Sequence, residues 1–377
     1  MHYPTCMILE QRARTVAWSS LEILTRGLLH LYLTVTFLGI TDFEERLEVG
    51  SFPTVAEVAA IADLATVTTG RLRQLIAKTG NAKNTDMTFA ATDAVTKPLV
   101  NRRLKIYQQF FDLISRTAER NQSDAQKRSE QLAQRNRIHK ILAGRRGPSR
   151  TSCIRGRHAP DELAQVVQFV VEGDPSLIWA NPALRERNWA LVSVLALCGL
   201  RSGELRQLRT TDFNSNRATL MVARRPDDPE DPRLREPNAK TADRIIPLFD
   251  PVLSRIETYV YGSQADAAQK GSPFLFLAHS PGRFGQPISR SVVTDTVRSL
   301  GQHLGMPGLH PHSLRNAWAQ NYASWADSVG VQAGEFDRYI KYLAGWSAKS
   351  QMATHYRGDQ LIQTAYQKSL LLEEQRG

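Results

Sequence analysis

Apolar side chains recur at helical spacing along most of the chain, and only short segments have the composition of strands. Residues 27–40 (GLLHLYLTVTFLGI) form the most apolar early run. This run is too short to span a bilayer and contains His30, so it predicts a buried helix. Residues 53–78 (PTVAEVAAIADLATVTTGRLRQLIAK) predict two short helices around a turn, which fit an ordinary helical hairpin or a helix-turn-helix.

A further helical pattern begins at Asn101. The face opposite its largely apolar stripe carries Arg102, Arg103 and Lys105. We therefore expect one face in a core and a basic face towards solvent. The stripe consists of Leu104, Tyr107, Gln108, Phe111 and Ile114.

The segment that follows is strongly basic, and its few acidic residues are chiefly Asp124 and Glu130. Residues 144–157 are rich in Gly, Pro, Ser and Arg, which predicts a linker. A basic linker suits a clamp around DNA, because each neutralised phosphate releases counterions, and it equally suits a solvated hinge. The basic residues are Lys127, Arg128, Arg135, Arg137, Lys140, Arg145, Arg146, Arg150, Arg155 and Arg157.

A second region begins near residues 159–161, where Asp161 is expected to cap a helix that ends at Gly173. A long apolar helix (NWALVSVLALCGL) then closes at Gly199. Residues 218–224 and 244–248 predict strands on either side of a long, acidic, proline-rich loop, and residues 274–278 (FLFLA) predict a strand or a buried turn. From Pro287 onward the pattern indicates helices.

Composition narrows the class of protein. A chain of 377 residues suggests two or three domains, and a net charge of +11 with a pI of about 9.7 favours a polyanionic partner, nucleic acid above all. Three cysteines without metal or redox spacing, and an N-terminus without a secretory layout, suit the cytoplasm, at the nucleoid if the host is bacterial. Nothing implies a membrane.

Two segments carry guanidinium groups suited to an anion. Arg201 follows the long apolar helix, where a fork-shaped cation favours phosphate, and Glu204 three residues later is placed to orient it. His312 and Arg315 in HSLR point the same way on a helix, so a second phosphate-binding fork lies beside a group that moves protons near neutral pH. Each pair taken alone also fits a structural role on a helix.

Lys240 precedes the second strand and can donate a proton to a leaving oxygen, although alone it resembles any surface lysine. Trp346 in LAGW donates a hydrogen bond but accepts no proton. Tyr356, ten residues later, is the candidate nucleophile, and a phenol needs a neighbouring base and cations to react at neutral pH. Other tyrosines of the same region are rivals by residue type: Tyr339, Tyr342 and Tyr366.

Together these residues, in this order, resemble the tyrosine recombinase (phage-integrase-like) family over about residues 158–370. GLRSGEL resembles the first family motif, KTADRIIPL the lysine hairpin, HSLR the H-x-L-R motif, and LAGW followed by HY the last motif. Asn316 stands where many relatives have His, and Trp346 replaces the commoner His. The spacing from Trp346 to Tyr356 is one residue longer than usual.

The resemblance implies a strand transfer at one phosphodiester. Tyr356 attacks phosphorus to form a 3′-phosphotyrosyl bond, while Arg201, Arg315 and Trp346 bind the non-bridging oxygens. His312 accepts the tyrosine proton and Lys240 protonates the departing 5′ oxygen. A 5′ hydroxyl then reverses the step, so neither a metal ion nor another cofactor is required.

The resemblance also implies a mainly α fold with a small antiparallel β-sheet. We expect a helical extension at 1–59, a helical core-binding DNA-binding domain at 60–150, a linker at 151–157 and the catalytic domain at 158–377. The implied partner is double-stranded DNA, bound as a homo-tetramer on two sites with room for an accessory DNA-bending protein. The C-terminal tail is expected to pack on a neighbouring protomer or on its own domain.

Three other functions remain open. A type IB topoisomerase shares the arginines, lysine and tyrosine but usually has Lys at the place of His312. A non-catalytic DNA-binding protein on the same fold would not need the complete residue set. A DNA-binding regulator would depend on the N-terminal helices alone.

Overall fold

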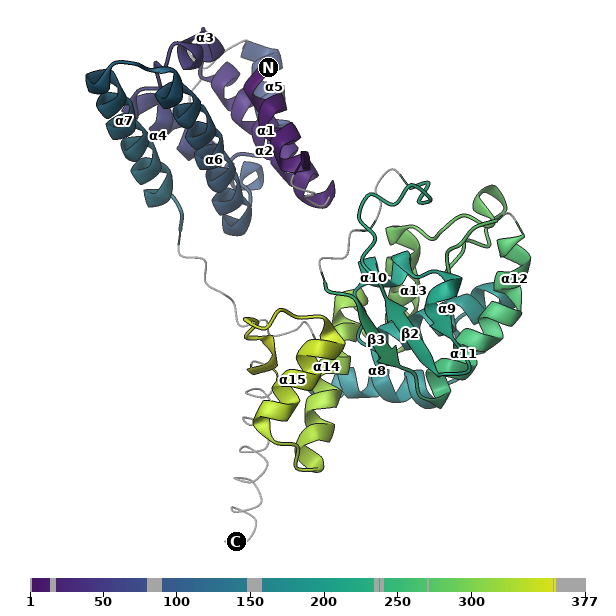
Figure 1. The fold of residues 1–377 in the computed structure, drawn as a ribbon. Helices are drawn as coiled ribbons and strands as arrows, with labels where there is room; N and C mark the ends of the chain where they lie inside the picture. The colour runs from purple at the N-terminus through teal and green to yellow at the C-terminus, as the bar shows by residue number, and fades with distance from the viewer. Residues whose placement is uncertain are drawn as a thin grey trace, which may run out of the picture. The chain divides into compact units, whose positions relative to one another are not determined.

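The computed structural model describes residues 2–13, 18–79, 90–147, 158–233, 237, 241–269, 271–354 and 356. Contacts divide the chain into two compact units, Met1–Ser152 and Cys153–Gly377. Helices dominate both units, and the second also has a three-stranded antiparallel sheet (Figure 1). The expected mainly α fold with a small antiparallel sheet is confirmed.

The described part of the first unit contains helices and no strand, with one isolated antiparallel bridge between Val67 and Ala94. Its core joins α2, α4 and α6, so residues on both sides of position 60 share one apolar cluster, and the boundary expected there stays a prediction. The expected stripe on α6 is buried except for half-buried Gln108. The helices are α1 (His2–Ala13), α2 (Trp18–Phe37), α3 (Phe43–Glu48), α4 (Val55–Leu64), α5 (Thr69–Thr79), α6 (Lys97–Asn121) and α7 (Ala125–Gly144).

The prediction that Arg103 faces solvent is wrong. Its side chain is buried, and Nη1 donates to the carbonyl oxygens of Ala65 at 2.8 Å and Val67 at 2.6 Å, which follow the end of α4. His30 on α2 lies in the same polar pocket, with Nε2 2.9 Å from the Val67 oxygen. The desolvation of the guanidinium is offset because it donates to two backbone carbonyl oxygens in the segment that follows α4.

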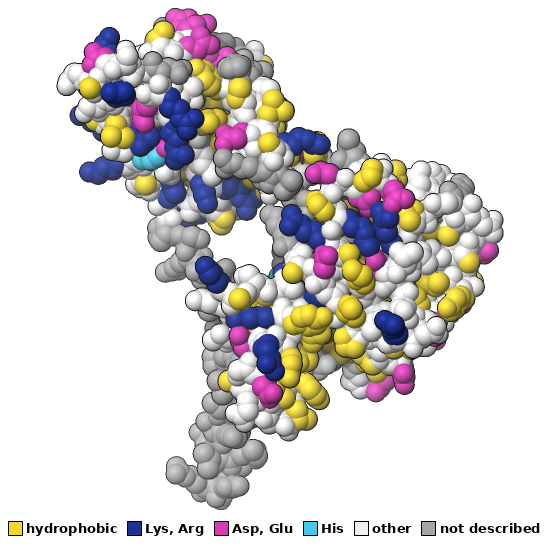
Figure 2. All heavy atoms as spheres, in the orientation of Figure 1, with side chains coloured by type: hydrophobic (Ala, Val, Ile, Leu, Met, Phe, Trp, Pro, Cys, Tyr) yellow, Lys and Arg dark blue, Asp and Glu magenta, His cyan; other side chains and the backbone are white. Residues whose placement is uncertain are grey.

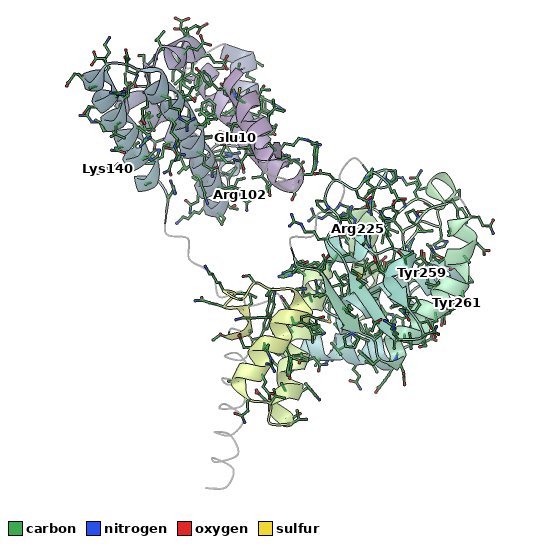
Figure 3. The ribbon with its side chains drawn as sticks, viewed as in Figure 1. Glu10, Arg102, Lys140, Arg225, Tyr259 and Tyr261 are labelled. Carbon is green, nitrogen blue, oxygen red and sulfur yellow. The ribbon has the colours of Figure 1, made fainter. Side chains whose placement is uncertain are left out.

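Arg102 and Lys105 are exposed as expected, and so are most basic residues of α7. Figure 2 shows Lys and Arg side chains recurring over α6 and α7, and Figure 3 shows Arg102 and Lys140 on these two helices. None of the helices in the described ranges is long and apolar enough to cross a membrane. The first unit thus presents a basic helical surface.

The second unit is built around α9, which is buried on nearly every side. It packs against α8, α11 and α14. The helix α8 starts at Pro160 with Ala159 as its cap, so the expected capping by Asp161 is wrong, while the end before Gly173 is confirmed. The helices are α8 (Pro160–Glu172), α9 (Pro182–Leu197), α10 (Ser202–Gln207), α11 (Asp250–Tyr261), α12 (Ser263–Ala268), α13 (Arg290–His303), α14 (Pro311–Ser328) and α15 (Ala333–Ala344).

The sheet contains β1 (Phe213–Asn214), β2 (Thr219–Val222) and β3 (Arg244–Pro247), in that spatial order. Leu220 faces Ile246, and both are buried, whereas Met221 and Ile245 point outward. The two strands expected from the sequence are confirmed, and β1 was not expected. Residues 274–278 form a buried segment with isolated bridges at Phe274 and Leu277 rather than a strand.

Helices α14 and α15 lie side by side and have an apolar cluster of their own (Figure 1). Trp318 and Ala323 of α14 meet Phe336 and Ile340 of α15, and Tyr356 belongs to the same cluster. The last described part of the chain is therefore attached to α14, the helix that carries His312 and Arg315.

Candidate active site

Arg201 leaves the core at the end of α9 and caps α10. Gly199 has a φ of +66°, and a Cβ there would lie 2.2 Å from the Trp318 ring, so only glycine fits this turn. Arg201 is the more accessible of the two candidate arginines, with 39% of its side chain exposed. Its Nη1 atom donates to Glu204 Oε1 at 3.1 Å and to the Ala344 carbonyl oxygen, also at 3.1 Å.

Arg315 meets Arg201 at that same carbonyl. Its Nη2 atom donates to the Ala344 oxygen at 2.7 Å, and Nη1 donates to the Gly199 oxygen. Arg315 is buried, and burial followed by the charge of Arg201 lowers its pKa to about 9. Two guanidiniums from segments more than a hundred residues apart thus converge on one oxygen atom, and guanidinium is a group well suited to binding phosphate.

A buried carboxylate lies behind the arginines. Glu204 is fully buried and binds Arg244 Nη2 at 2.9 Å, the Arg201 amide at 2.8 Å and the Thr241 hydroxyl at 2.7 Å. Burial alone would raise the pKa of Glu204, but the Arg244 bond and charge, with the other donors, lower it to about 2. Its negative charge therefore persists at neutral pH and orients the cations around it.

Trp346 follows the end of α15, which Gly345 terminates at a φ of +60°. The Arg315 guanidinium carbon lies 5.6 Å from the centre of the Trp346 ring. Tyr356 stacks on that ring with the planes 3° apart and the centres 5.9 Å apart. The Trp346 indole thus contacts both the Arg315 guanidinium and the Tyr356 phenol.

The hydroxyl of Tyr356 donates to Oδ1 of Asn316 at 2.7 Å. The ring is 6% exposed. Of the rival tyrosines, Tyr342 exchanges hydrogen bonds with the Ile245 backbone of β3, and Tyr339 is exposed beside Arg338. Tyr366 lies outside the described residues. Among the described candidates, Tyr356 is the one that contacts Trp346 and the residue next to Arg315.

His312 is an exposed residue in the first turn of α14, whose next three residues are buried. Partial desolvation lowers its pKa, and the positive charges of Arg315, His310 and Arg201 lower it further. The imidazole is therefore neutral at pH 7 and can accept a proton. Its neighbour His310 caps the helix, with Nδ1 2.6 Å from the Ser313 hydroxyl.

Lys240 lies outside the described residues, so its side chain is not placed. The next residue, Thr241, bonds to Glu204, and Arg244 of β3 donates from Nε to the Leu343 oxygen of α15 at 2.8 Å. The segment that follows Lys240 is therefore connected to Glu204, which binds Arg201, and to α15. Within the described ranges, no three His, Cys, Asp or Glu side chains are grouped to hold a metal ion.

Sequence reasoning missed two contributors, Arg244 and the Ala344 carbonyl. Asn316 was noted only as a departure from a family pattern, and its contact with Tyr356 was not foreseen. Arg244 stood in the quoted KTADRIIPL segment, but nothing local indicated a buried partner forty residues away.

The fold and site define a mainly helical protein in which two arginines meet at one carbonyl oxygen, a histidine lies within electrostatic reach of both, and an indole lies between one of the arginines and a tyrosine. Residues 160–360, more than half of the chain, match the phage integrase family. The chain belongs to this family.

The curated proteins that the chain resembles in sequence include tyrosine recombinases and a putative integrase. Tyrosine recombinase XerC of Xanthomonas axonopodis pv. citri (strain 306) is 26% identical over 194 residues, covering 51% of this chain and 56% of that protein. The putative integrase/recombinase y4rF of Sinorhizobium fredii (strain NBRC 101917 / NGR234) is 27% identical over 187 residues, covering 43% of this chain and 39% of that protein. The chain spans about half the length of these relatives.

One solved structure resembles the chain over most of its length. The XerH site-specific recombinase, bound to palindromic difH substrate in a post-cleavage complex, has a TM-score of 0.52 and 14% identity, covering 91% of this chain and 94% of that one. At this identity the likeness establishes the fold alone.

Proposed function

We propose that this chain is a site-specific DNA recombinase that cuts and rejoins strands through a 3′-phosphotyrosyl intermediate on Tyr356. The meeting of Arg201 and Arg315 at the Ala344 oxygen carries the proposal. A non-bridging phosphate oxygen is the same kind of acceptor with a larger negative charge, so it would bind these donors more strongly than a carbonyl does. Family membership supports the same activity.

The chemistry assigns one task to each group. The Tyr356 oxygen bonds to phosphorus, the bond from phosphorus to the 5′ oxygen breaks, and the phenol proton passes to His312. Lys240 supplies the proton that the departing 5′ oxygen takes up. Arg201, Arg315 and the Trp346 N–H stabilise the charge that grows on the non-bridging oxygens.

The second half of the reaction reverses the first. A 5′ hydroxyl attacks the phosphotyrosine and gives its proton to Lys240, the bond between phosphorus and the tyrosine oxygen breaks, and Tyr356 regains its proton from His312. Energy stays in the covalent link, so the proposed reaction needs no cofactor.

Double-stranded DNA is the proposed partner, which the basic surface of α6 and α7 and the net charge of +11 support. Assembly of four copies on two sites, with an accessory DNA-bending protein where the site demands it, belongs to the same proposal. The mass of the complex on a captured duplex, measured by analytical ultracentrifugation, tests the assembly.

The decisive experiment uses a library of nicked duplexes with randomised sequence around the nick. Cleavage beside the nick releases a short fragment, so the covalent adduct is trapped and appears as a shifted band on a denaturing gel. We expect this band from the wild type, from Tyr339→Phe and from Tyr342→Phe, and none from Tyr356→Phe. Persistence of the band in Tyr356→Phe would refute the assignment, and relaxation of any plasmid without site preference would favour a topoisomerase.

A further inference from the structure

Asn316 is the residue directly after Arg315 on α14, and its side chain holds the hydroxyl of Tyr356. The phenol donates to Oδ1 at 2.7 Å across forty residues of sequence. Asn316 is half-buried, and the tyrosine ring is held from its flat side by Trp346. The phenol is thus held on its ring by Trp346 and on its oxygen by Asn316.

The stacking contact by itself constrains the position of the phenol oxygen only weakly. A parallel stack resists tilting of the ring, but it resists sliding within the ring plane and rotation about the ring normal only weakly, because dispersion contacts lack direction. A hydrogen bond to the oxygen has a preferred length and angle, so it determines where the oxygen lies. Since Asn316 adjoins Arg315 on the same helix, the bond sets the phenol oxygen relative to the guanidinium.

An amide suits this task because it does not compete for the proton. Asn316 accepts a hydrogen bond but has no basic nitrogen, so the proton remains available to His312. A carboxylate at this position would hold the proton more strongly and would place a negative charge beside the incoming phosphate. A hydrocarbon at this position would remove the directional contact that Asn316 makes with the oxygen.

We propose that Asn316 is a positioning residue that fixes the Tyr356 oxygen for attack on the phosphate bound by Arg201 and Arg315. The proposal rests on the function proposed above. It assigns Asn316 no contact with DNA and no proton transfer.

The test compares three variants on a duplex captured by the wild type. Asn316→Leu keeps the branched shape and removes the acceptor, whereas Asn316→His places Nδ1, a new acceptor, on the carbon that carried Oδ1. Gln320→Leu is the matched control, because it removes an amide one turn further along α14 whose Oε1 atom has no hydrogen-bond partner among the described residues. Each variant is assayed for DNA affinity and for the rate of adduct formation at saturating DNA.

We expect Asn316→Leu to slow adduct formation by roughly 10- to 100-fold, the usual effect of misplacing a reacting atom, with DNA affinity within about twofold of wild type. Asn316→His should recover part of the rate, because its Nδ1 restores an acceptor for the phenol but also competes for the proton, and Gln320→Leu should match the wild type. A wild-type rate in Asn316→Leu overturns the proposal, as does an equal loss of affinity and rate that histidine fails to recover. Absence of an adduct from the wild type would overturn the proposed function itself, a different outcome from failure of Asn316→Leu alone.

Discussion

Arg244 and Glu204 form an ion pair closed off from solvent: Nη2 lies 2.9 Å from Oε2 and Nη1 lies 3.3 Å from Oε1, with 2% and 0% of the side chains exposed. Removing one partner of such a pair leaves a buried charge uncompensated. We expect Arg244→Met to reduce the free energy of unfolding of the second unit by about 3–5 kcal/mol. Urea unfolding followed by tryptophan fluorescence measures the change.

The control for Arg244→Met is Arg298→Met. Arg298 pairs with Asp295 on the surface, where more than half of each side chain is exposed. Exposed pairs contribute about 1 kcal/mol or less, so this variant should unfold almost like the wild type. Equal losses in both variants would mean that the Glu204 pair contributes nothing beyond an ordinary surface contact.

Gly345 provides a second prediction. Its φ of +60° costs an alanine about 1–2 kcal/mol, and the added Cβ would lie 2.7 Å from Arg244 Nη1 and 3.0 Å from Thr241. Gly345→Ala should therefore destabilise α15 and slow adduct formation, since the Ala344 carbonyl and Trp346 flank the turn. Thermal unfolding and the nicked-duplex assay give the two readouts.

Gly334, near the start of the same helix, serves as the comparison. A Cβ there meets no atom within 4 Å, and alanine is the better helix former. Gly334→Ala should keep both the unfolding temperature and the adduct rate at or above wild-type values. If both glycine variants behave alike, the turn at Gly345 has no special role.

Acid should weaken the first unit through His30. Burial, followed by the charge of Arg103, lowers the His30 pKa from 6.5 to about 4. Between pH 6.5 and 4 the unfolded chain therefore binds a proton at His30 that the folded chain does not bind. The free energy of unfolding has its full value above about pH 6.5 and falls as the pH drops towards 4, by about 3 kcal/mol at most. Hydrogen exchange of α2 and α6 amides across this range measures the loss.

His30→Gln separates this effect from other titrations, because glutamine has no proton to bind in that range. The variant should lose stability less steeply between pH 6.5 and 4 in α2 and α6, even if its stability at pH 7 is lower. An unchanged slope would assign the acid sensitivity to other groups.

The sequence predicted those features that depend on local pattern. Four elements have a pattern of apolar residues that recurs over several positions, and the structure contains all of them: the buried stripe on α6, the apolar helix α9, and strands β2 and β3. Arg103 was misplaced because helical spacing gives only the direction of a side chain. Two carbonyls at the end of α4, supplied by a distant segment, decided its burial.

Contacts between distant segments also limited how much of the site the sequence could predict. Arg201 and Arg315 were chosen by residue type and order, and the structure brings their guanidiniums together. The pairs Glu204–Arg244 and Asn316–Tyr356 each join residues forty positions apart, and no helical or strand period relates such positions. Their partners are defined by packing, which a single sequence does not display.

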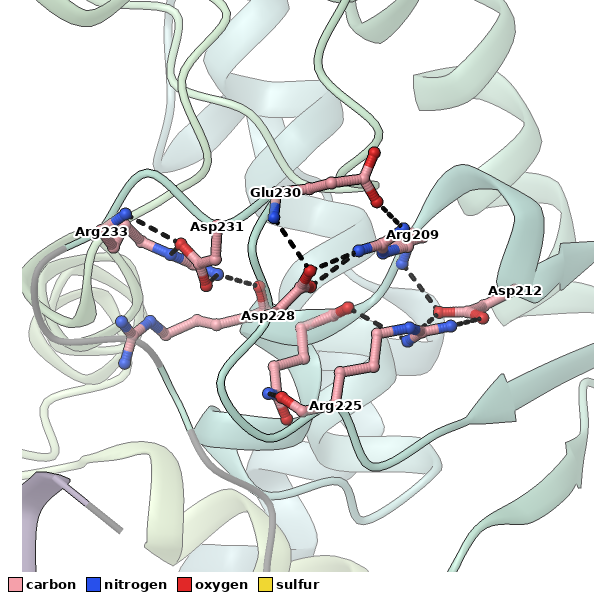
Figure 4. Close-up of polar contacts among 9 residues, drawn as sticks. Arg209, Asp212, Arg225, Asp228, Glu230, Asp231 and Arg233 are labelled. Atoms are coloured by element: carbon pink, nitrogen blue, oxygen red, sulfur yellow. Dashed lines mark hydrogen bonds and ion pairs between the residues drawn. The ribbon is translucent and has the colours of Figure 1, made fainter. Parts of the chain in front are cut away.

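The long loop after β2 is acidic, as expected, and Asp228, Glu230 and Asp231 in its described part are paired with arginines. Arg209 donates to the two carboxylate oxygens of Asp228 at 2.8 and 2.7 Å and also pairs with Glu230 (Figure 4). Two further ion pairs join Arg225 to Asp212 and Arg233 to Asp231. The Asp228 side chain is 8% exposed, so its bonds are shielded from water. Ion pairs of Arg209 and Arg225 thus connect the described part of this loop to the body of the second unit.

Asp228→Asn should loosen this loop. The change removes the charge and one of the two acceptors for Arg209, and hydrogen bonds to charged groups contribute about 1.5–3 kcal/mol each. We expect amides 223–233 to exchange with solvent about tenfold faster or more, while α9 and α11 are unaffected. Asp227→Asn is the matched control, because Asp227 is exposed and its φ of +49° suits asparagine. Equal exchange in the two variants would show that the loss of charge alone, and not the Arg209 contact, sets the mobility of the loop.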